Sequence, residues 1–326
     1  MKNEILRLLK TRDTYISGQQ LCDDFHVSRT AVWKAIEQLK KEGYEIEAVR
    51  NRGYRLKESP DVLSEAEIGS NLCTSWAGRN LICYSETDST NNRAKEAGEK
   101  QAPHGMLFVA DEQTAGKGRR GRVWVSPPGT SVYMTILLRP DIEPSKAPML
   151  TLVMGLSVAE GIRKATGVEA KIKWPNDIVV NQKKVCGILT EMSTEIQSVN
   201  YVVIGDGINT NQKEFPEEIR QMATSLCLEC GQPVRRAELI AAVMEQFEKN
   251  YETFMKTKDL SGLKEAYNAI LVNCNRQVRI LEPGNEYEAM AEGIDRMGEL
   301  IVRLPDGQKK NIFAGEVSVR GMYGYV

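Results

Sequence analysis

Histidine is scarce in this chain, with only His26 and His104 among 326 residues. Histidine is the side chain that titrates nearest neutral pH, so acid–base mechanisms that need several histidines have few candidates. The seven cysteines are scattered and odd in number, which favours reduced thiols and a cytoplasmic setting. The pair Cys227 and Cys230 has no second pair or nearby histidine, so two half-buried thiols are a better interpretation than a zinc site.

Long apolar runs are also missing. The most apolar segment, residues 147–159, is interrupted by Thr151, Gly155 and Ser157, which argues against a membrane-spanning helix. The first ten residues alternate charged and apolar side chains, unlike a signal peptide. The net charge of −1 gives the whole molecule no attraction to nucleic acid, so any such binding needs a local patch. The length predicts two or three domains.

The N-terminal segment is locally basic: residues 1–57 hold 12 Lys or Arg and 8 Asp or Glu. Apolar residues at helical spacing predict a first helix, Ser17 caps a short second helix, and Ser28 caps a longer one that ends at Gly43. Alternation over residues 44–56, with a turn near 51–53, predicts a hairpin. This is the order of a winged helix-turn-helix, although a small helical interaction domain with a solvated charged face remains an alternative.

DNA binding by this segment would use the turn before the second helix, the longer helix in a major groove, and the hairpin on phosphates. A single domain of this kind makes few phosphate contacts, so useful affinity predicts a dimer on a two-fold site. The candidate DNA-binding residues are Ser17, Gly18, Gln19, Gln20, Ser28, Arg29, Thr30, Trp33, Lys34, Arg50, Arg52 and Arg55.

The stretch over residues 113–122 combines three glycines, one lysine and three arginines between two strand-like runs. Glycine lets backbone N–H groups approach a ligand closely, and clustered donors favour an anion. A phosphate or carboxylate site and a solvated basic loop both fit this composition. A Walker A loop does not, because Asp111 stands where its first glycine belongs and Gly118 where Ser or Thr belongs. Nor does 205–207 have the third glycine of a dinucleotide-binding fingerprint.

Other polar residues gather at turns and strand ends. Residues 88–91 supply oxygens and amides at a helix start, and residues 171–177 place lysines, Trp174, Asn176 and Asp177 on one bend. Lys184 lies just inside a strand, and a second strand ends in the glycine-punctuated segment 205–211. Strands joined by hairpins predict a mixed α+β sheet, and short strands over 277–313 predict a small all-β barrel.

Five motifs together resemble the bacterial biotin–protein ligases that also repress the biotin operon. They are Ser89–Asn91, residues 113–122 with Trp124, Lys173–Asp177, Lys184–Leu189 and Gly205–Asn209. Lys117 stands where arginine is often found, and Asn92 where glutamine can occur. Lysine keeps the charge and loses the planar fork. The resemblance implies a winged helix-turn-helix over 1–60, an α+β catalytic domain over 61–272 and an SH3-like barrel over 273–326.

The same resemblance implies the chemistry. With ATP and Mg²⁺, biotin would become biotinyl-5′-AMP and then pass to a lysine of the biotin carboxyl carrier domain of acetyl-CoA carboxylase. The adenylate-bound form would be a homodimer that binds operator DNA. Lys184 and Arg119 would be the catalytic residues. Biotin would bind Ser89, Thr90, Asn91, Gln113, Lys117, Gly118, Arg119 and Lys184. The nucleotide would bind Arg119, Arg120, Arg122, Trp124, Lys173, Asn176, Asp177 and Asn209.

Two alternatives differ in activity. A lipoate–protein ligase shares the catalytic fold by family analogy, but the N-terminal DNA-binding segment and the 116–121 loop argue against it. A sensor without catalysis would lack the lysine at 184 or the basic loop, and this chain has both.

Overall fold

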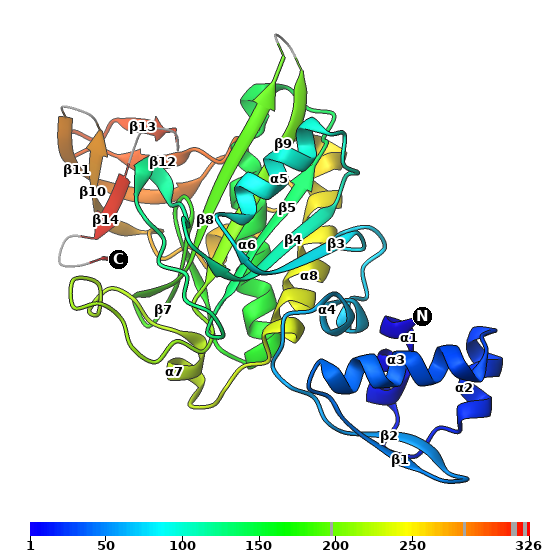
Figure 1. Ribbon diagram of the computed structural model, residues 1–326. Helices are drawn as coiled ribbons and strands as arrows, with labels where there is room; N and C mark the ends of the chain where they lie inside the picture. The colour runs from blue at the N-terminus through cyan, green and yellow to red at the C-terminus, as the bar shows by residue number, and fades with distance from the viewer. Residues whose placement is uncertain (196–197, 283–284, 314–317, 322–324) are drawn as a thin grey trace. The chain divides into compact units, whose positions relative to one another are not determined.

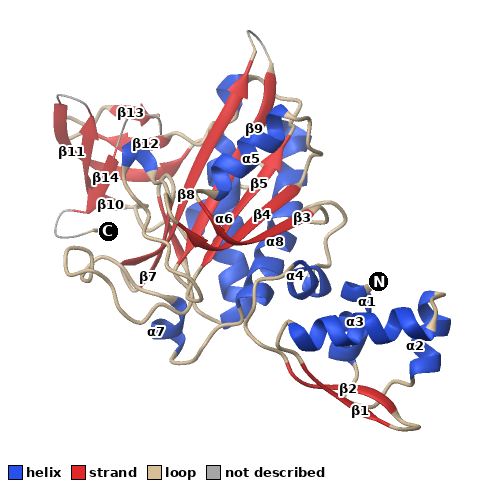
Figure 2. Cartoon of the chain, in the orientation of Figure 1, coloured by secondary structure: helices blue, strands red, loops and turns tan. Residues whose placement is uncertain are grey.

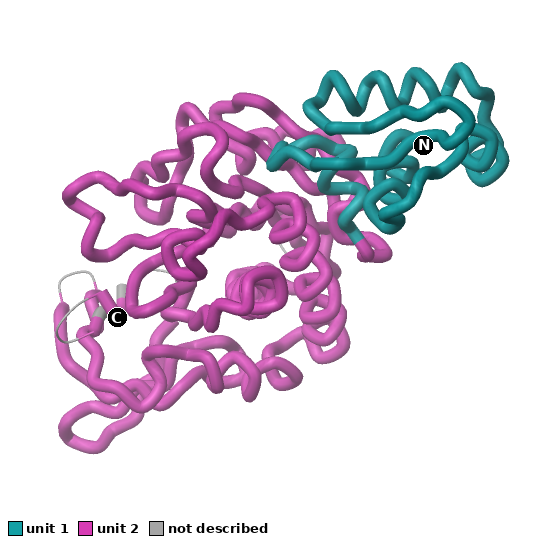
Figure 3. The backbone as a smooth tube through the Cα atoms, turned by 90° about the horizontal axis from the view of Figure 1, so that it is seen from below, with its two compact units in different colours: residues 1–72 teal, residues 73–326 magenta. Residues whose placement is uncertain are grey.

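The computed structural model describes residues 1–195, 198–282, 285–313, 318–321 and 325–326 (Figure 1). Its chain forms two compact units, Met1–Leu72 and Cys73–Val326, which Figure 3 colours separately. Among the described residues, no helix is both long and apolar enough to cross a membrane.

The first unit has the predicted helix-turn-helix and wing. Its elements are α1 (Lys2–Thr11), α2 (Gly18–Phe25), α3 (Arg29–Lys41), β1 (Glu45–Val49), β2 (Gly53–Glu58) and α4 (Glu65–Asn71). Ser17 and Ser28 cap α2 and α3 as predicted, accepting hydrogen bonds from the Gln20 and Ala31 amides. Strands β1 and β2 form the wing, and β2 begins at Gly53 after the hairpin turn. At Gly53 φ is +108°, and a Cβ would lie 2.0 Å from the Ile16 carbonyl oxygen. Only glycine fits this position.

Helix α4 was not predicted, and it packs on α1 inside the first unit. Ser64 caps it, and Glu67, which is only 1% exposed, accepts hydrogen bonds from Lys10 and from the Tyr44 hydroxyl. A buried carboxylate needs such partners. The first compact unit therefore runs to Leu72 and includes α4.

The second unit is built on a seven-stranded mixed sheet (Figure 2), which confirms the predicted α+β class. In chain order its strands are β3 (Leu81–Thr87), β4 (Met106–Gln113), β5 (Val132–Leu138), β6 (Lys171–Lys173), β7 (Asp177–Val180), β8 (Lys183–Thr194) and β9 (Val199–Ile208). They are arranged β3-β4-β5-β9-β8-β7-β6, with β3 and β4 parallel and all other pairs antiparallel.

Helices lie on both faces of this sheet. The helices of the second unit are α5 (Thr90–Glu99), α6 (Met149–Thr166), α7 (Leu226–Cys230), α8 (Arg236–Thr257) and α9 (Lys264–Ala269), and of these α5 and α6 pack directly on the strands. Figure 1 shows α5 in front of the sheet and the packed pair α6 and α8 behind it. Helix α6 buries side chains around most of its circumference, as its apolar sequence predicts for a core helix.

The C-terminal part forms the expected small β-domain. Its strands are β10 (Arg276–Glu282), β11 (Asn285–Ile294), β12 (Leu300–Arg303), β13 (Lys309–Ile312) and β14 (Ser318–Gly321). They pair antiparallel in the order β13-β12-β11-β10-β14.

Candidate active site

Hydroxyl and amide side chains form one end of a cavity of about 50 Å³ above β8 and β9. Ser89 precedes α5 but makes no side-chain cap bond, and Thr90 and Asn91 are buried in its first turn. The Gln113 side-chain oxygen accepts hydrogen bonds from the Thr90 amide at 2.9 Å and its hydroxyl at 3.1 Å. Asn91 donates to Glu191 at 2.8 Å. Capping therefore does not explain these residues, which instead line a polar pocket.

The glycines of β9 and of the basic loop allow close packing around this cavity. A Cβ on Gly205 would lie 2.0 Å from the Asn91 side-chain oxygen, and one on Gly207 would lie 2.5 Å from the Trp124 indole. A Cβ on Gly116 would meet the Trp124 carbonyl at 2.3 Å. The glycines thus let the Trp124 ring lie directly on the strands. Its indole nitrogen is buried and has no hydrogen-bond partner among the described residues, so it is available to an acceptor.

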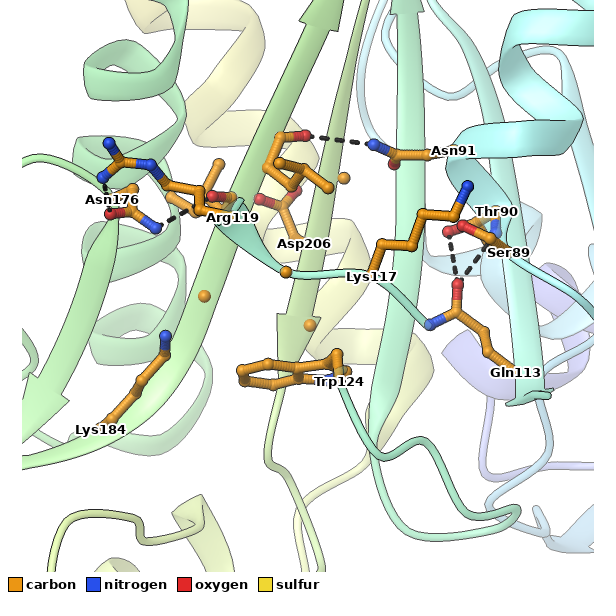
Figure 4. Close-up of a pocket in the computed structure, with 16 residues that line it drawn as sticks. Ser89, Thr90, Asn91, Gln113, Lys117, Arg119, Trp124, Asn176, Lys184 and Asp206 are labelled. Carbon is orange, nitrogen blue, oxygen red and sulfur yellow. Dashed lines mark hydrogen bonds between the residues drawn. The ribbon is translucent and has the colours of Figure 1, made fainter. Parts of the chain in front are cut away.

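Positive side chains form the other end of the cavity (Figure 4). The Lys184 ammonium contacts the Asp177 carboxylate at 2.6 Å and lies 5.2 Å from the centre of the Trp124 ring. Arg119 donates to Asn176 at 2.8 Å. Burial alone would raise the pKa of Asp177, but the charges of Lys184 and Lys173 outweigh it and lower that pKa. The carboxylate is therefore ionised, and it orients Lys184.

A second cavity of about 290 Å³ adjoins the first, and both are lined by Gly118, Arg119, Trp124, Asn176 and Lys184. All eight residues predicted to bind biotin line the first cavity, and all eight predicted to bind a nucleotide line the second. The structure thus places the residues of the five motifs together. Their individual roles remain predictions.

The second cavity also has an apolar wall that sequence reasoning missed. It consists of Phe215, Pro216, Ile219 and Met222, with Val123 and Val125 from the basic loop. The same segment holds Lys184 in place, because the Lys184 amide donates to the Met222 carbonyl at 2.7 Å and its carbonyl accepts from the Thr224 amide at 2.9 Å. The three- and four-residue spacing of Phe215, Ile219 and Met222 was the available signal.

Among the predicted DNA-binding residues near the start of α2, Ser17 and Gln19 are exposed, whereas Gly18 and Gln20 are half-buried. The α3 side chains Ser28, Arg29, Thr30, Trp33 and Lys34 are all exposed, as are Arg50 and Arg52 of the wing. Trp33 is 54% exposed, which is unusual for a tryptophan. Arg55 differs from them because it is half-buried and donates to Glu47 at 3.0 Å, although both Arg52 and Arg55 lie over the Tyr15 ring.

Comparison with known proteins matches all three parts of the chain. Residues 83–209 match the biotin/lipoate A/B protein ligase family, residues 2–55 match an HTH domain, and residues 274–320 match the biotin protein ligase C-terminal domain. The bifunctional ligase/repressor BirA of Bacillus subtilis (strain 168) is 42% identical over 322 residues, which is 98% of each chain. The chain belongs to the bifunctional ligase/repressor family of biotin protein ligases.

Two further relatives match smaller parts of the chain. BirA of Escherichia coli (strain K12) is 30% identical over 305 residues, which is 93% of this chain and 92% of that protein. A biotin protein ligase from Aquifex aeolicus, solved with biotin and ATP, is 33% identical with a TM-score of 0.66, covering 74% of this chain and 99% of that one. This member of the family is therefore a biotin–protein ligase with an N-terminal DNA-binding domain.

Asp206 is a further cavity residue that the sequence analysis passed over. It lies between Gly205 and Gly207 in β9, is 3% exposed, and neither carboxylate oxygen has a hydrogen-bond partner among the described residues. Burial raises the pKa of Asp206 well above its ordinary value. Burial, followed by the charge of Asp206, also raises the pKa of the Cys186 thiol. An unpaired carboxyl in this position stays protonated where an exposed one ionises.

This burial predicts a stability that falls with rising pH. Above pH ~4 the unfolded chain loses the Asp206 proton, whereas the folded protein keeps it. The contribution of this proton to the free energy of unfolding is therefore complete below pH ~4 and is lost as the pH rises towards the raised pKa of Asp206. The slope is about 1.4 kcal/mol per pH unit for one proton. We expect the free energy of unfolding of Asp206→Asn, measured in denaturant between pH 5 and 8, to increase relative to that of wild type as the pH rises. The exposed control Asp306→Asn is expected to show no such trend, and a pH-independent difference for Asp206→Asn would contradict the assignment.

Proposed function

We propose that this chain couples biotin to ATP at the junction of its two cavities and then transfers the biotinyl group to a lysine of a biotin carboxyl carrier domain. The observation that carries the proposal is the set of residues common to both cavities, Lys184, Arg119, Trp124, Asn176 and Gly118. A reaction that joins two ligands needs this arrangement, in which cations lie between one polar cavity and one larger, partly apolar cavity.

The polar cavity fits biotin. Ser89, Thr90, Asn91 and Gln113 offer both donors and acceptors, which suits a ureido ring. Lys117 lies on the cavity wall, where its ammonium donates to Asn92 at 3.1 Å beside Ser89 and Thr90 (Figure 4), so contact with the biotin carboxylate would require this side chain to turn toward Arg119. The larger cavity fits the nucleotide, because Phe215, Ile219 and Met222 provide an apolar wall for a base.

The chemistry follows from charge. A carboxylate oxygen of biotin attacks the α-phosphorus of ATP, the bond to the bridging oxygen breaks, and pyrophosphate leaves. Both reactants are anions, so Lys184 and Arg119 offset their repulsion and stabilise the charge that spreads over the phosphoryl oxygens. The Lys184 ammonium has three N–H donors, so it can contact the reactants while Asp177 still holds it. The Trp124 ring and the loop over residues 113–122 then shield the adenylate from water.

Magnesium fits the nucleotide end as a companion of ATP. No group of three or more His, Cys, Asp or Glu side chains that could hold a metal occurs in the described ranges. Asp177, with Asn176 and Asn209 beside it, offers oxygen ligands on the wall of the larger cavity. Magnesium commonly binds one or two carboxylates together with substrate phosphates, where it neutralises phosphate charge.

The N-terminal unit supplies the second activity. We infer that the adenylate-bound chain dimerises and places α3 of each protomer in a major groove of operator DNA, with Arg50 and Arg52 on the phosphates. The exposed face of α3 supports this assignment. The adenylate would favour the dimer, and consumption of the adenylate by the carrier domain would lower DNA occupancy by mass action.

The test of ligation uses the full chain with ATP, Mg²⁺, biotin and a purified carrier domain. We expect one biotin per carrier lysine, detected as a mass increase, with AMP and pyrophosphate formed in equal amounts. Lipoate in place of biotin is expected to give no product. Transfer of lipoate but not biotin would identify a lipoate ligase, and absence of any transfer would leave only a biotin-sensing repressor.

A further inference from the structure

Tyr325, which follows β14, reaches the nucleotide end of the active site from the C-terminal β-domain. Its hydroxyl donates to Asp177, and the Lys173 ammonium lies 3.6 Å from the centre of its ring. It also lines the larger cavity. Both residues that it contacts belong to the Lys173–Asp177 motif, and both are largely shielded from water: Lys173 is 5% exposed and the Asp177 side chain 15%.

Gly321 and Val326, which is the neighbour of Tyr325 in the chain, approach each other closely. A Cβ on Gly321 would lie 2.0 Å from the Val326 carbonyl oxygen and 2.2 Å from its carbon. Real Cβ atoms do not approach backbone atoms this closely, so any larger residue at 321 would displace Val326 or the end of β14. Glycine at this position therefore allows Val326 to pack against β14, next to Tyr325, whose hydroxyl contacts Asp177.

The Asp177 carboxylate has partners on both oxygens, and Asn176 donates a further, longer hydrogen bond of 3.3 Å to the oxygen that faces Lys184. One oxygen contacts Lys184 at 2.6 Å, and the other accepts from the Tyr325 hydroxyl. A carboxylate held at both oxygens cannot rotate freely, so its position, and through it the position of the Lys184 ammonium, depends on Tyr325. The ring meanwhile covers Lys173, whose charge it stabilises by a cation–π contact.

We propose that Tyr325 is a positioning residue for the ATP-dependent step, acting on Lys184 through Asp177 and directly on Lys173. This inference rests on the proposed function. It brings the C-terminal β-domain into the active site and predicts that Tyr325 serves only the half of the reaction that uses ATP. In the proposed function, biotin binds in the smaller cavity at Ser89 and Gln113, away from Tyr325. Transfer of the biotinyl group from biotinyl-5′-AMP takes place after pyrophosphate has left, so this step does not need the part of the larger cavity that holds pyrophosphate.

The experiment compares Tyr325→Phe, which keeps the ring, with Tyr325→Leu, which loses ring and hydroxyl. In biotin-dependent pyrophosphate exchange we expect kcat/KM for ATP to fall about tenfold in the first and about 100-fold in the second, as for loss of a hydrogen bond to a charged group and then of a further cation contact. The Kd for biotin, measured by calorimetry, and the rate of transfer from added biotinyl-5′-AMP are expected to stay within twofold of wild type. Gly321→Ala introduces a Cβ that meets Val326, the neighbour of Tyr325, and leaves the cavity side chains unchanged. This variant is expected to lower kcat/KM for ATP as much as Tyr325→Leu.

Tyr287 provides a matched control in the same β-domain. Its hydroxyl donates to Glu282 at 2.9 Å and the Lys310 ammonium lies 4.8 Å from its ring centre, so Tyr287→Phe removes an equivalent bond away from both cavities. This variant is expected to leave all three measurements unchanged. Equal ATP kinetics in wild type and Tyr325→Leu would overturn the inference alone, as would a uniform loss in all three measurements. A wild-type chain without pyrophosphate exchange would overturn the proposed function together with it.

Discussion

Replacing Lys184 with alanine lowers the rate of biotinyl-adenylate formation by about 100- to 1,000-fold, the effect expected when one preorganised charge at a reacting centre is lost. Lys184 is the lysine common to the walls of both cavities, and its backbone is held on each side by Met222 and Thr224. No other described lysine lines the two cavities together. Single-turnover formation of adenylate, with biotin and ATP saturating, measures the chemical step directly.

The neighbouring lysine is the matched control for this result. Lys183 is exposed and alternates to the other side of β8, so Lys183→Ala removes the same charge from the same strand. It is expected to leave the rate within twofold of wild type. Lys184→Ala also deprives Asp177 of an ion-pair partner, so circular dichroism and denaturant titration should accompany the kinetics. A folded Lys184→Ala protein with an unchanged single-turnover rate would remove Lys184 from the mechanism.

Local sequence patterns predicted most residues that line the two cavities, but they predicted fewer of the elements around them. The basic loop, the Ser89–Asn91 turn and Lys184 each carry a charge or glycine pattern with a chemical meaning, and their mutual approach followed from a family resemblance. Periodicity alone did not predict that approach, because β8 and β9 bring together segments 100 residues apart, as in the contact of Asn91 with Glu191. Helix α4 was missed because seven residues after a proline-containing segment give too short a window for helical periodicity.

Tyr325 and Asp206 illustrate the part that sequence reasoning could not reach. Tyr325 is one of two tyrosines in the short segment 321–326, which has no period to single it out, and only the folded β-domain brings it to Asp177. Asp206 breaks the apolar pattern of a buried strand, and in a sequence such a residue is as easily assigned to a turn. Neither residue follows the apolar and polar periodicity from which secondary structure is predicted. Such exceptions occur in proteins mainly at functional or strained positions.

Reversing the charge of α3 abolishes operator binding while leaving ligation intact. Arg29→Glu with Lys34→Glu replaces two exposed cations on the proposed groove face by two anions, and a dimer carries the change twice. Each lost contact costs about 1–3 kcal/mol, so we expect affinity to fall by at least about 100-fold. The probe is the duplex that adenylate-bound wild type selects from a random pool, and the measurement is fluorescence anisotropy across a salt series, whose slope should decrease by about 1 per lost phosphate contact.

Net charge by itself must be separated from the position of the charge. Arg7→Glu with Lys41→Glu makes the same change at exposed residues of the same unit, outside the proposed contact surface. If DNA binding depends on the α3 face, this control loses only the weak, long-range attraction that salt screens. An equal loss in both double variants would mean that the unit attracts DNA by overall charge, and selection of no duplex at all by the wild-type protein would exclude the repressor activity. Ligation in both variants should equal wild type, because the cavities are lined entirely by residues of the second unit.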